Sequence, residues 1–184
     1  MESGYEITLE YPALRHKEAV LGYLQEHIGQ GEYSLHGACG LDHALSYEGW
    51  LEGINRCAQA GGDIRSTTFF GVRKCDGKII GTIDIRHEQD ECLERYSGHV
   101  AYGVRPMERK KGYATQMLHL ALDYCVQLGI DDVLLSCASC NIAGAKTILK
   151  CGGVFESEAT SAPEILQRYR IRPLKILEGE IISV

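Results

Sequence analysis

The sequence lacks any long apolar run, and no signal-peptide or transit-peptide pattern is present. A membrane-spanning helix needs about 20 consecutive apolar residues, so the sequence predicts a cytoplasmic protein without a membrane partner. An excess of basic residues is also missing. Lys and Arg total 19 against 25 Asp and Glu, for a net charge of -6. This balance argues against nucleic acid as the main partner and mildly favours small cationic substrates.

Two common phosphate-binding motifs are absent. Neither Gly-x-x-x-x-Gly-Lys-Ser/Thr nor Gly-x-Gly-x-x-Gly occurs, which excludes the nucleotide-binding loops built on them. A metal site is not expected either. Cys137-x-x-Cys140 has metal-like spacing but no second Cys or His pair, and structural zinc takes four ligands. Without an export signal, reduced thiols are expected for all eight cysteines, at positions 39, 57, 75, 92, 125, 137, 140 and 151.

The chain is long enough to bury its own core. It has 184 residues, of which 45% are apolar and 24% charged. These values are typical of one globular domain, here expected to span residues 1–184.

Periodicity and turn signals predict eleven elements. Strands are expected at 5–10, 67–73, 78–86, 98–104, 132–137, 154–156 and 165–171, and helices at 13–28, after Ser46, within 105–128 and at 141–150. The first helix places Leu14, Leu21, Leu24 and Ile28 near one side. The order β-α-α-β-β-β-α-β-α-β-β predicts an α/β (α+β) fold. We expect a mixed, mostly antiparallel sheet with helices on both faces.

The stretch from Arg105 to Leu128 carries the clearest binding signal. An apolar strand ends at its start, and Arg109-Lys110-Lys111-Gly112 then leads into a helix with one apolar stripe. A helix N-terminus has free N–H groups and partial positive charge, so it binds anions readily. The alternative is an ordinary basic first turn, although cations are mildly unfavourable at that end. We predict a pyrophosphate cradle.

Two segments resemble the GNAT superfamily of N-acetyltransferases. Arg109-x-x-Gly112-x-Ala114 matches the acetyl-CoA signature Gln/Arg-x-x-Gly-x-Gly/Ala, and 141–152 resembles the family's Asn-containing helix. A bacterial subgroup of predicted acetyltransferases shares 85–87, 98–99, 102–106 and 111–115. The resemblance implies a GNAT-like domain with acetyl-CoA as co-substrate. The positions it implies for cofactor binding are Gly103, Val104, Arg109, Lys110, Lys111, Gly112, Tyr113, Ala114, Thr115, Asn141 and Lys146.

Acetyl transfer to nitrogen needs a neutral amine and a donor for the oxyanion. Deprotonating a lysine-like amine of pKa about 10.4 costs roughly 4–5 kcal/mol at pH 7, whereas an α-amine near 8 costs about 1.4 kcal/mol. The first kind therefore needs a general base, and the second can use a water relay. The resemblance places the oxyanion donor at a backbone N–H near Val104.

His99 and Tyr102 are the candidate catalytic side chains on the strand before the cradle. His99 has a suitable ordinary pKa of about 6.5, but the family's usual base aligns with Gly98 or Val100, so a structural histidine is an equal alternative. Tyr102 is a candidate acid, with a core aromatic as its alternative. Acids in the segment 87–97, among them Glu91 and Glu94, are further candidates for the base.

One position departs from the family pattern. Ile148 stands where many members carry the tyrosine that protonates the thiolate, which leaves Tyr102, Tyr169 or water for that step. The expected function is transfer of acetyl from acetyl-CoA to a primary amine of a small molecule or peptide by direct attack in a ternary complex. The alternative is a catalytically weak or inactive CoA-binding sensor module.

The acceptor amine is not identified by the sequence. Its choice is expected to lie with the segment Gly29–Leu45, the second helix and the last hairpin. Homodimer formation is left open.

Overall fold

A computed structural model describes residues 4–59, 65–87, 98–161, 164–173, 175–177 and 180–182. Its first sheet is antiparallel with the order β1-β2-β3-β4 and contains β1 (Ile7–Glu10), β2 (Ser66–Arg73), β3 (Ile79–Arg86) and β4 (Val100–Val104). The second is antiparallel with the order β5-β7-β6 and contains β5 (Val133–Ala138), β6 (Val154–Ser161) and β7 (Glu164–Ile171). A separate pair contains β8 (Lys175–Leu177) and β9 (Glu180–Ile182).

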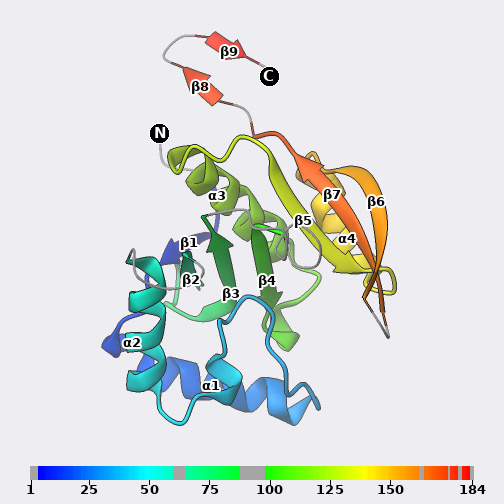
Figure 1. Cartoon of the computed structure of the whole chain (residues 1–184). Helices are drawn as coiled ribbons and strands as arrows, with labels where there is room; N and C mark the ends of the chain where they lie inside the picture. The colour runs from blue at the N-terminus through cyan, green and yellow to red at the C-terminus, as the bar shows by residue number, and fades with distance from the viewer. Residues whose placement is uncertain are drawn as a thin grey trace.

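The helices follow the predicted order (Figure 1). They are α1 (Lys17–Gly29), α2 (Tyr47–Ala58), α3 (Tyr113–Gln127) and α4 (Ile142–Lys150), with short 3-10 turns at Leu14–His16, Leu41–His43 and Pro106–Glu108. The predicted α/β fold with helices on both faces is confirmed. What was expected as one mixed sheet is divided into two antiparallel sheets, because β4 and β5 meet only at a single bridge between Gly98 and Leu135 within the described residues.

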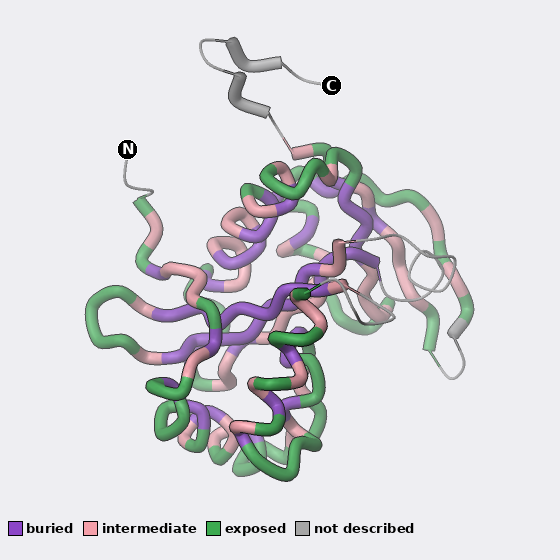
Figure 2. The backbone as a smooth tube through the Cα atoms, turned by 60° about the vertical axis from the view of Figure 1, so that its left-hand side comes forward, coloured by how far each residue is buried: buried purple, intermediate pink, exposed green. Residues whose placement is uncertain are grey.

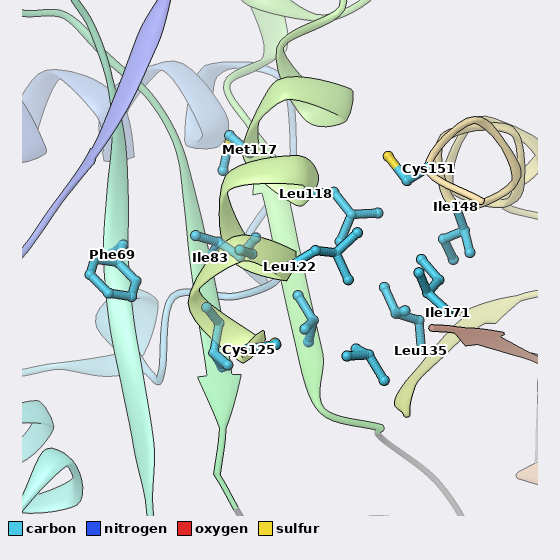
Figure 3. Packing of buried hydrophobic residues seen from close by; sticks show 14 of the residues in the cluster. Phe69, Ile83, Met117, Leu118, Leu122, Cys125, Leu135, Ile148, Cys151 and Ile171 are labelled. Carbon is cyan, nitrogen blue, oxygen red and sulfur yellow. The ribbon is translucent and has the colours of Figure 1, made fainter. Parts of the chain in front are cut away.

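Helix α3 builds the larger core because its apolar stripe contacts both sheets. Figure 3 shows Met117, Leu118 and Leu122 between Phe69 and Ile83 of the first sheet and Ile148 and Leu135 beyond. Burying one such aliphatic side chain contributes about 1.5–3 kcal/mol. The two middle strands β2 and β3 are buried along almost their whole length (Figure 2). Packing therefore fixes α3 against β2 and β3.

Helices α1 and α2 cover the other face of the first sheet. The buried residues there include Val20, Tyr23, Trp50 and Phe70. Of the four residues expected on one side of the first helix, Leu24 packs against this core, whereas Leu14, Leu21 and Ile28 are more than half exposed.

The buried stripe of α1 is Val20, Tyr23 and His27 instead. Each of these two polar side chains has one hydrogen-bonding partner, whereas His27 Nε2 is buried with none among the described residues. The Tyr23 hydroxyl lies 3.4 Å from Thr82 Oγ1, and His27 Nδ1 lies 2.9 Å from Glu32 Oε2. An analysis of apolar periodicity omits such residues, because Tyr and His combine an apolar ring with a polar group.

Local turn chemistry explains two of the element boundaries. Ser46 caps α2 as predicted, with its hydroxyl accepting a hydrogen bond from Gly49 N at 3.1 Å. The turn between β2 and β3 places Gly77 at φ +69°, a conformation that favours glycine.

Candidate functional site

The candidate site begins at the opening between β4 and β5, which diverge beyond the bridge at Gly98 (Figure 1). Arg105 N donates to Ile80 O at 2.7 Å, so the Arg105 N–H points toward β3. Successive residues of an extended strand point their N–H and C=O groups to opposite sides. The N–H and C=O of Val104 therefore face away from β3, toward this opening. This orientation is the one an oxyanion donor requires.

The segment after β4 combines two left-handed residues with a helix start. Lys110 has φ +62° and Gly112 has φ +85°, both left-handed, and α3 begins at Tyr113. Gln116 N donates to Gly112 O at 3.2 Å, so the N–H groups at 113–115 precede the helical hydrogen-bond ladder. Turns with left-handed residues beside a helix N-terminus direct successive N–H groups at one point. This geometry supports the predicted cradle.

The cations around the cradle differ in what they contact. Lys111 Nζ donates to Glu108 at 2.9 Å, and the Arg109 side chain contacts Glu32 and Val104 O. Lys110 and Lys146 are exposed and form no ion pair within the part of the chain that the structure describes. The side chains of these two lysines are therefore not committed to a carboxylate among the described residues.

The first residues of α3 contact neighbouring elements of the fold. Tyr113 is buried, and its hydroxyl accepts from Arg73 at 3.4 Å. Ala114 packs against the larger core, and Thr115 O is 3.8 Å from Cys151 Sγ. Tyr113 therefore offers the cradle its backbone, while its side chain fixes the helix start.

Glu108 is a residue of this region that the sequence analysis missed. It is 4% exposed and accepts hydrogen bonds from Lys78 at 2.6 Å, Lys111 at 2.9 Å and Arg73 at 3.0 Å. The bonds from Lys78 and Lys111 lower the Glu108 pKa to about 2. The signal that could have found it is a single acid directly before three cations. Glu108 ties the cradle to the β2–β3 hairpin.

Tyr102 reaches across the opening to α4. Its hydroxyl lies 3.5 Å from Gly144 O, and burial, together with the nearby thiols Cys151 and Cys137, raises its pKa above the ordinary value. The phenol therefore stays protonated at physiological pH. Gly144 lies one turn before Ile148, which is buried in the core. Tyr102 thus brings a hydroxyl to the side of α4 where the family's tyrosine is missing.

His99 joins the two sheets. Its Nδ1 accepts from Leu134 N at 2.9 Å, and the backbone N–H of His99 donates to Leu134 O at 2.7 Å. A neutral imidazole has one acceptor nitrogen, and here that nitrogen is occupied. Burial lowers the His99 pKa, as does the charge of Arg170. These contacts favour the structural alternative for His99 over the general base.

We expect His99→Ala to lower the free energy of unfolding by about 2–3 kcal/mol, because Leu134 N–H is left buried without its acceptor. His99→Asn, whose amide oxygen can replace Nδ1, should recover part of that loss. Because the folded pKa is depressed, the histidine's contribution is present above about pH 6.5 and is lost as pH falls through the folded value. Denaturant titrations at several pH values measure this. Equal loss of turnover in both variants without loss of stability would instead indicate a base.

Gly103 and Asn141 also have partners inside the protein. A Cβ at Gly103 would lie 2.7 Å from His36 O, so this glycine allows the segment between α1 and α2 to pack on β4. Asn141 Oδ1 caps α4 by accepting from Gly144 N at 2.9 Å. Gly103 lies in β4, and Asn141 follows the end of β5.

An open groove of about 730 Å³ lies between the segment 39–46 and α2, with Trp50 and Ile54 in its wall. Beneath this region is Asp84, which the sequence analysis also missed. It is 5% exposed and accepts from Thr68 Oγ1 at 2.8 Å. One charged residue between Ile83 and Ile85 was the available signal.

Several expectations concern what is absent. Within the described ranges, no group of three His, Cys, Asp or Glu could hold a metal, and none of the helices is long and apolar enough to cross a membrane. The seven cysteines among the described residues are unpaired. Cys92, Glu91 and Glu94 lie outside those residues.

Comparisons with known proteins identify the family. The chain is similar to the microcin C7 self-immunity acetyltransferase MccE (TM-score 0.69, 18% identity, 91% of this chain and 92% of that one). It is also similar to ribosomal-protein-S5-alanine acetyltransferase of Vibrio fischeri (0.67, 15%, 93% and 95%) and to a chimera of spermidine N-acetyltransferase of Vibrio cholerae (0.64, 17%, 92% and 96%). These likenesses show the fold.

A search of the curated proteins finds no match in sequence. The sequence model of the acetyltransferase (GNAT) family, by contrast, matches residues 33–152. This range is more than half of the chain and includes the segment between α1 and α2, the first sheet from β2 onward, the cradle and α4. The chain therefore belongs to the GNAT family of acetyltransferases.

Proposed function

We propose that this protein transfers the acetyl group of acetyl-CoA to a primary amine of a small molecule or peptide, by direct attack in a ternary complex. The observation that carries the proposal is the pairing of two features: the Val104 N–H faces the opening between β4 and β5, and the cradle at 109–115 follows directly. Structural relatives support the donor, since MccE was solved with acetyl-CoA. The unpaired thiols among the described cysteines are consistent with a cytoplasmic setting.

In this mechanism the amine nitrogen attacks the thioester carbonyl carbon, and the carbonyl oxygen becomes an oxyanion. Val104 N–H donates to that oxygen. As the carbon–sulfur bond breaks, Tyr102 donates a proton or a hydrogen bond to the leaving thiolate. Loss of the amine proton to water or to a neighbouring base completes the transfer. The acceptor's class is left at primary amines, because the relatives include enzymes named for ribosomal proteins and for spermidine.

We expect mixing the protein with acetyl-CoA and a panel of small amines and peptides to release free thiol only when the right amine is present. Mass spectrometry should then find that amine heavier by one acetyl group. A second candidate function, a CoA-binding sensor, is favoured by one observation, Ile148 in the core in place of the usual tyrosine. Tight CoA binding by calorimetry, without thiol release across the panel, would support the sensor and contradict the transferase.

A further inference from the structure

The side chain of Arg109, the first residue of the acetyl-CoA signature, is directed at the protein itself. Its Nε donates to Val104 O at 2.9 Å. Its Nη1 and Nη2 donate to Glu32 Oε1 and Oε2 at 2.5 and 2.6 Å. This bidentate geometry makes arginine–carboxylate pairs strong and directional. All three guanidinium nitrogens are thereby occupied.

Glu32 is also hydrogen-bonded to His27. His27 Nδ1 lies 2.9 Å from its Oε2, and Glu32 N donates to His27 O at 2.9 Å. His27 is 4% exposed and packs edge-on against Tyr23, with ring centroids 4.6 Å apart. The hydrogen bond from Arg109 lowers the Glu32 pKa to about 2, so the carboxylate is ionised at any physiological pH. The end of α1 thus presents a fixed anion to Arg109.

Two parts of the site meet at this pair. In an extended strand, the C=O and N–H of one residue point to the same side, so a bond to the Val104 carbonyl also fixes the direction of the Val104 N–H. Glu32 begins the segment that packs on β4, where His36 O approaches Gly103 closely and accepts from Thr82 at 3.0 Å. The guanidinium of Arg109 therefore joins the end of β4 to the segment 32–37.

We infer that Arg109 and Glu32 act as a positioning pair. The pair holds the Val104 N–H and the segment 32–37 in the relative positions that acetyl transfer requires. In this assignment Arg109 contributes its backbone to the cradle, and phosphate charge is met by other cations. The inference rests on the proposed function for its effect on turnover, but the geometry it describes can be tested without turnover.

The test compares Glu32→Gln and Arg109→Gln with Glu10→Gln. Glu10 is a matched control because it also accepts from an arginine (Arg15, 2.8 Å), also contacts a histidine (His16, 3.3 Å), and is 33% exposed in its side chain, as is Glu32. We expect both positioning variants to lower kcat about 10-fold or more, with less than about a 3-fold change in the CoA dissociation constant. The double variant should be no worse than the single ones, because the two residues act as a unit.

Amide hydrogen exchange gives a second measurement that is independent of catalysis. Exchange at Gly103 and 33–37 should accelerate about 10-fold or more in Glu32→Gln and remain unchanged in Glu10→Gln. Unchanged exchange in Glu32→Gln would overturn the inference, whether or not the protein turns over. So would an Arg109→Gln variant that binds CoA at least 10-fold more weakly and keeps its kcat, since that result would make Arg109 a phosphate ligand. A wild type without turnover would instead count against the proposed function.

Discussion

Replacing Gly112 by leucine is expected to abolish CoA binding, with an affinity loss of about 100-fold or more, while the protein stays folded. Gly112 has φ +85°, and a Cβ built there meets nothing within 4 Å. The fold therefore has room for the side chain. In the proposed cradle the N–H groups at 113–115 hold a pyrophosphate in this open space, and a leucine side chain would fill it.

Gly129 provides the matched control for this substitution. It lies just beyond the other end of α3, has φ +77°, and its Cβ position is equally open. Leucine at either glycine should cost about 1–2 kcal/mol of stability, because a non-glycine residue is forced into the left-handed region. Calorimetry with CoA should separate the two: Gly129→Leu binds as wild type and Gly112→Leu does not bind. Unchanged affinity in Gly112→Leu would show that the cradle is misplaced.

Replacing Tyr102 by phenylalanine is expected to lower turnover roughly 100-fold and leave the CoA affinity unchanged. The substitution removes only the hydroxyl near α4, where its hydrogen bond to Gly144 O is long at 3.5 Å. Little stability should therefore be lost. The phenol carries a raised pKa and stays protonated, so the pH profile of the remaining activity should keep its shape. Stopped-flow thiol release with saturating acetyl-CoA measures the effect.

Tyr47→Phe is the control for loss of a buried phenol. The Tyr47 hydroxyl also donates to a backbone carbonyl, Ala13 O at 2.8 Å, and burial raises its pKa to about 12. It lies on the opposite face of the first sheet from α3 and should leave turnover intact. Full activity in Tyr102→Phe would exclude Tyr102 as the acid. Tyr169, whose hydroxyl donates to Gln167 at 2.8 Å, or water would then remain for that step.

The sequence alone predicted the order of the helices and strands from β1 to β7, and it placed a basic turn with a glycine at the start of α3. Both depend on short-range regularities: the stripe along 113–127, the alternation in the strands, and a glycine between a basic turn and a helix start. Such features are set by backbone geometry within a few residues, so they can be read without knowing what packs where. Such short-range patterns do not show which side of a helix packs on a sheet. The apolar side predicted for α1, with Leu14 and Leu21, is largely exposed for this reason.

Only the tertiary structure decided which charges meet. Arg109 and Glu32 are 77 positions apart, and Lys78 and Glu108 are 30 apart. Nothing local to Arg109 distinguishes a phosphate ligand from a partner of Glu32, because a guanidinium suits both oxyanions equally well. The choice follows from where α1 ends relative to β4. That position is set by the burial of Tyr23 and His27 against the first sheet, and so by packing between residues far apart in the chain.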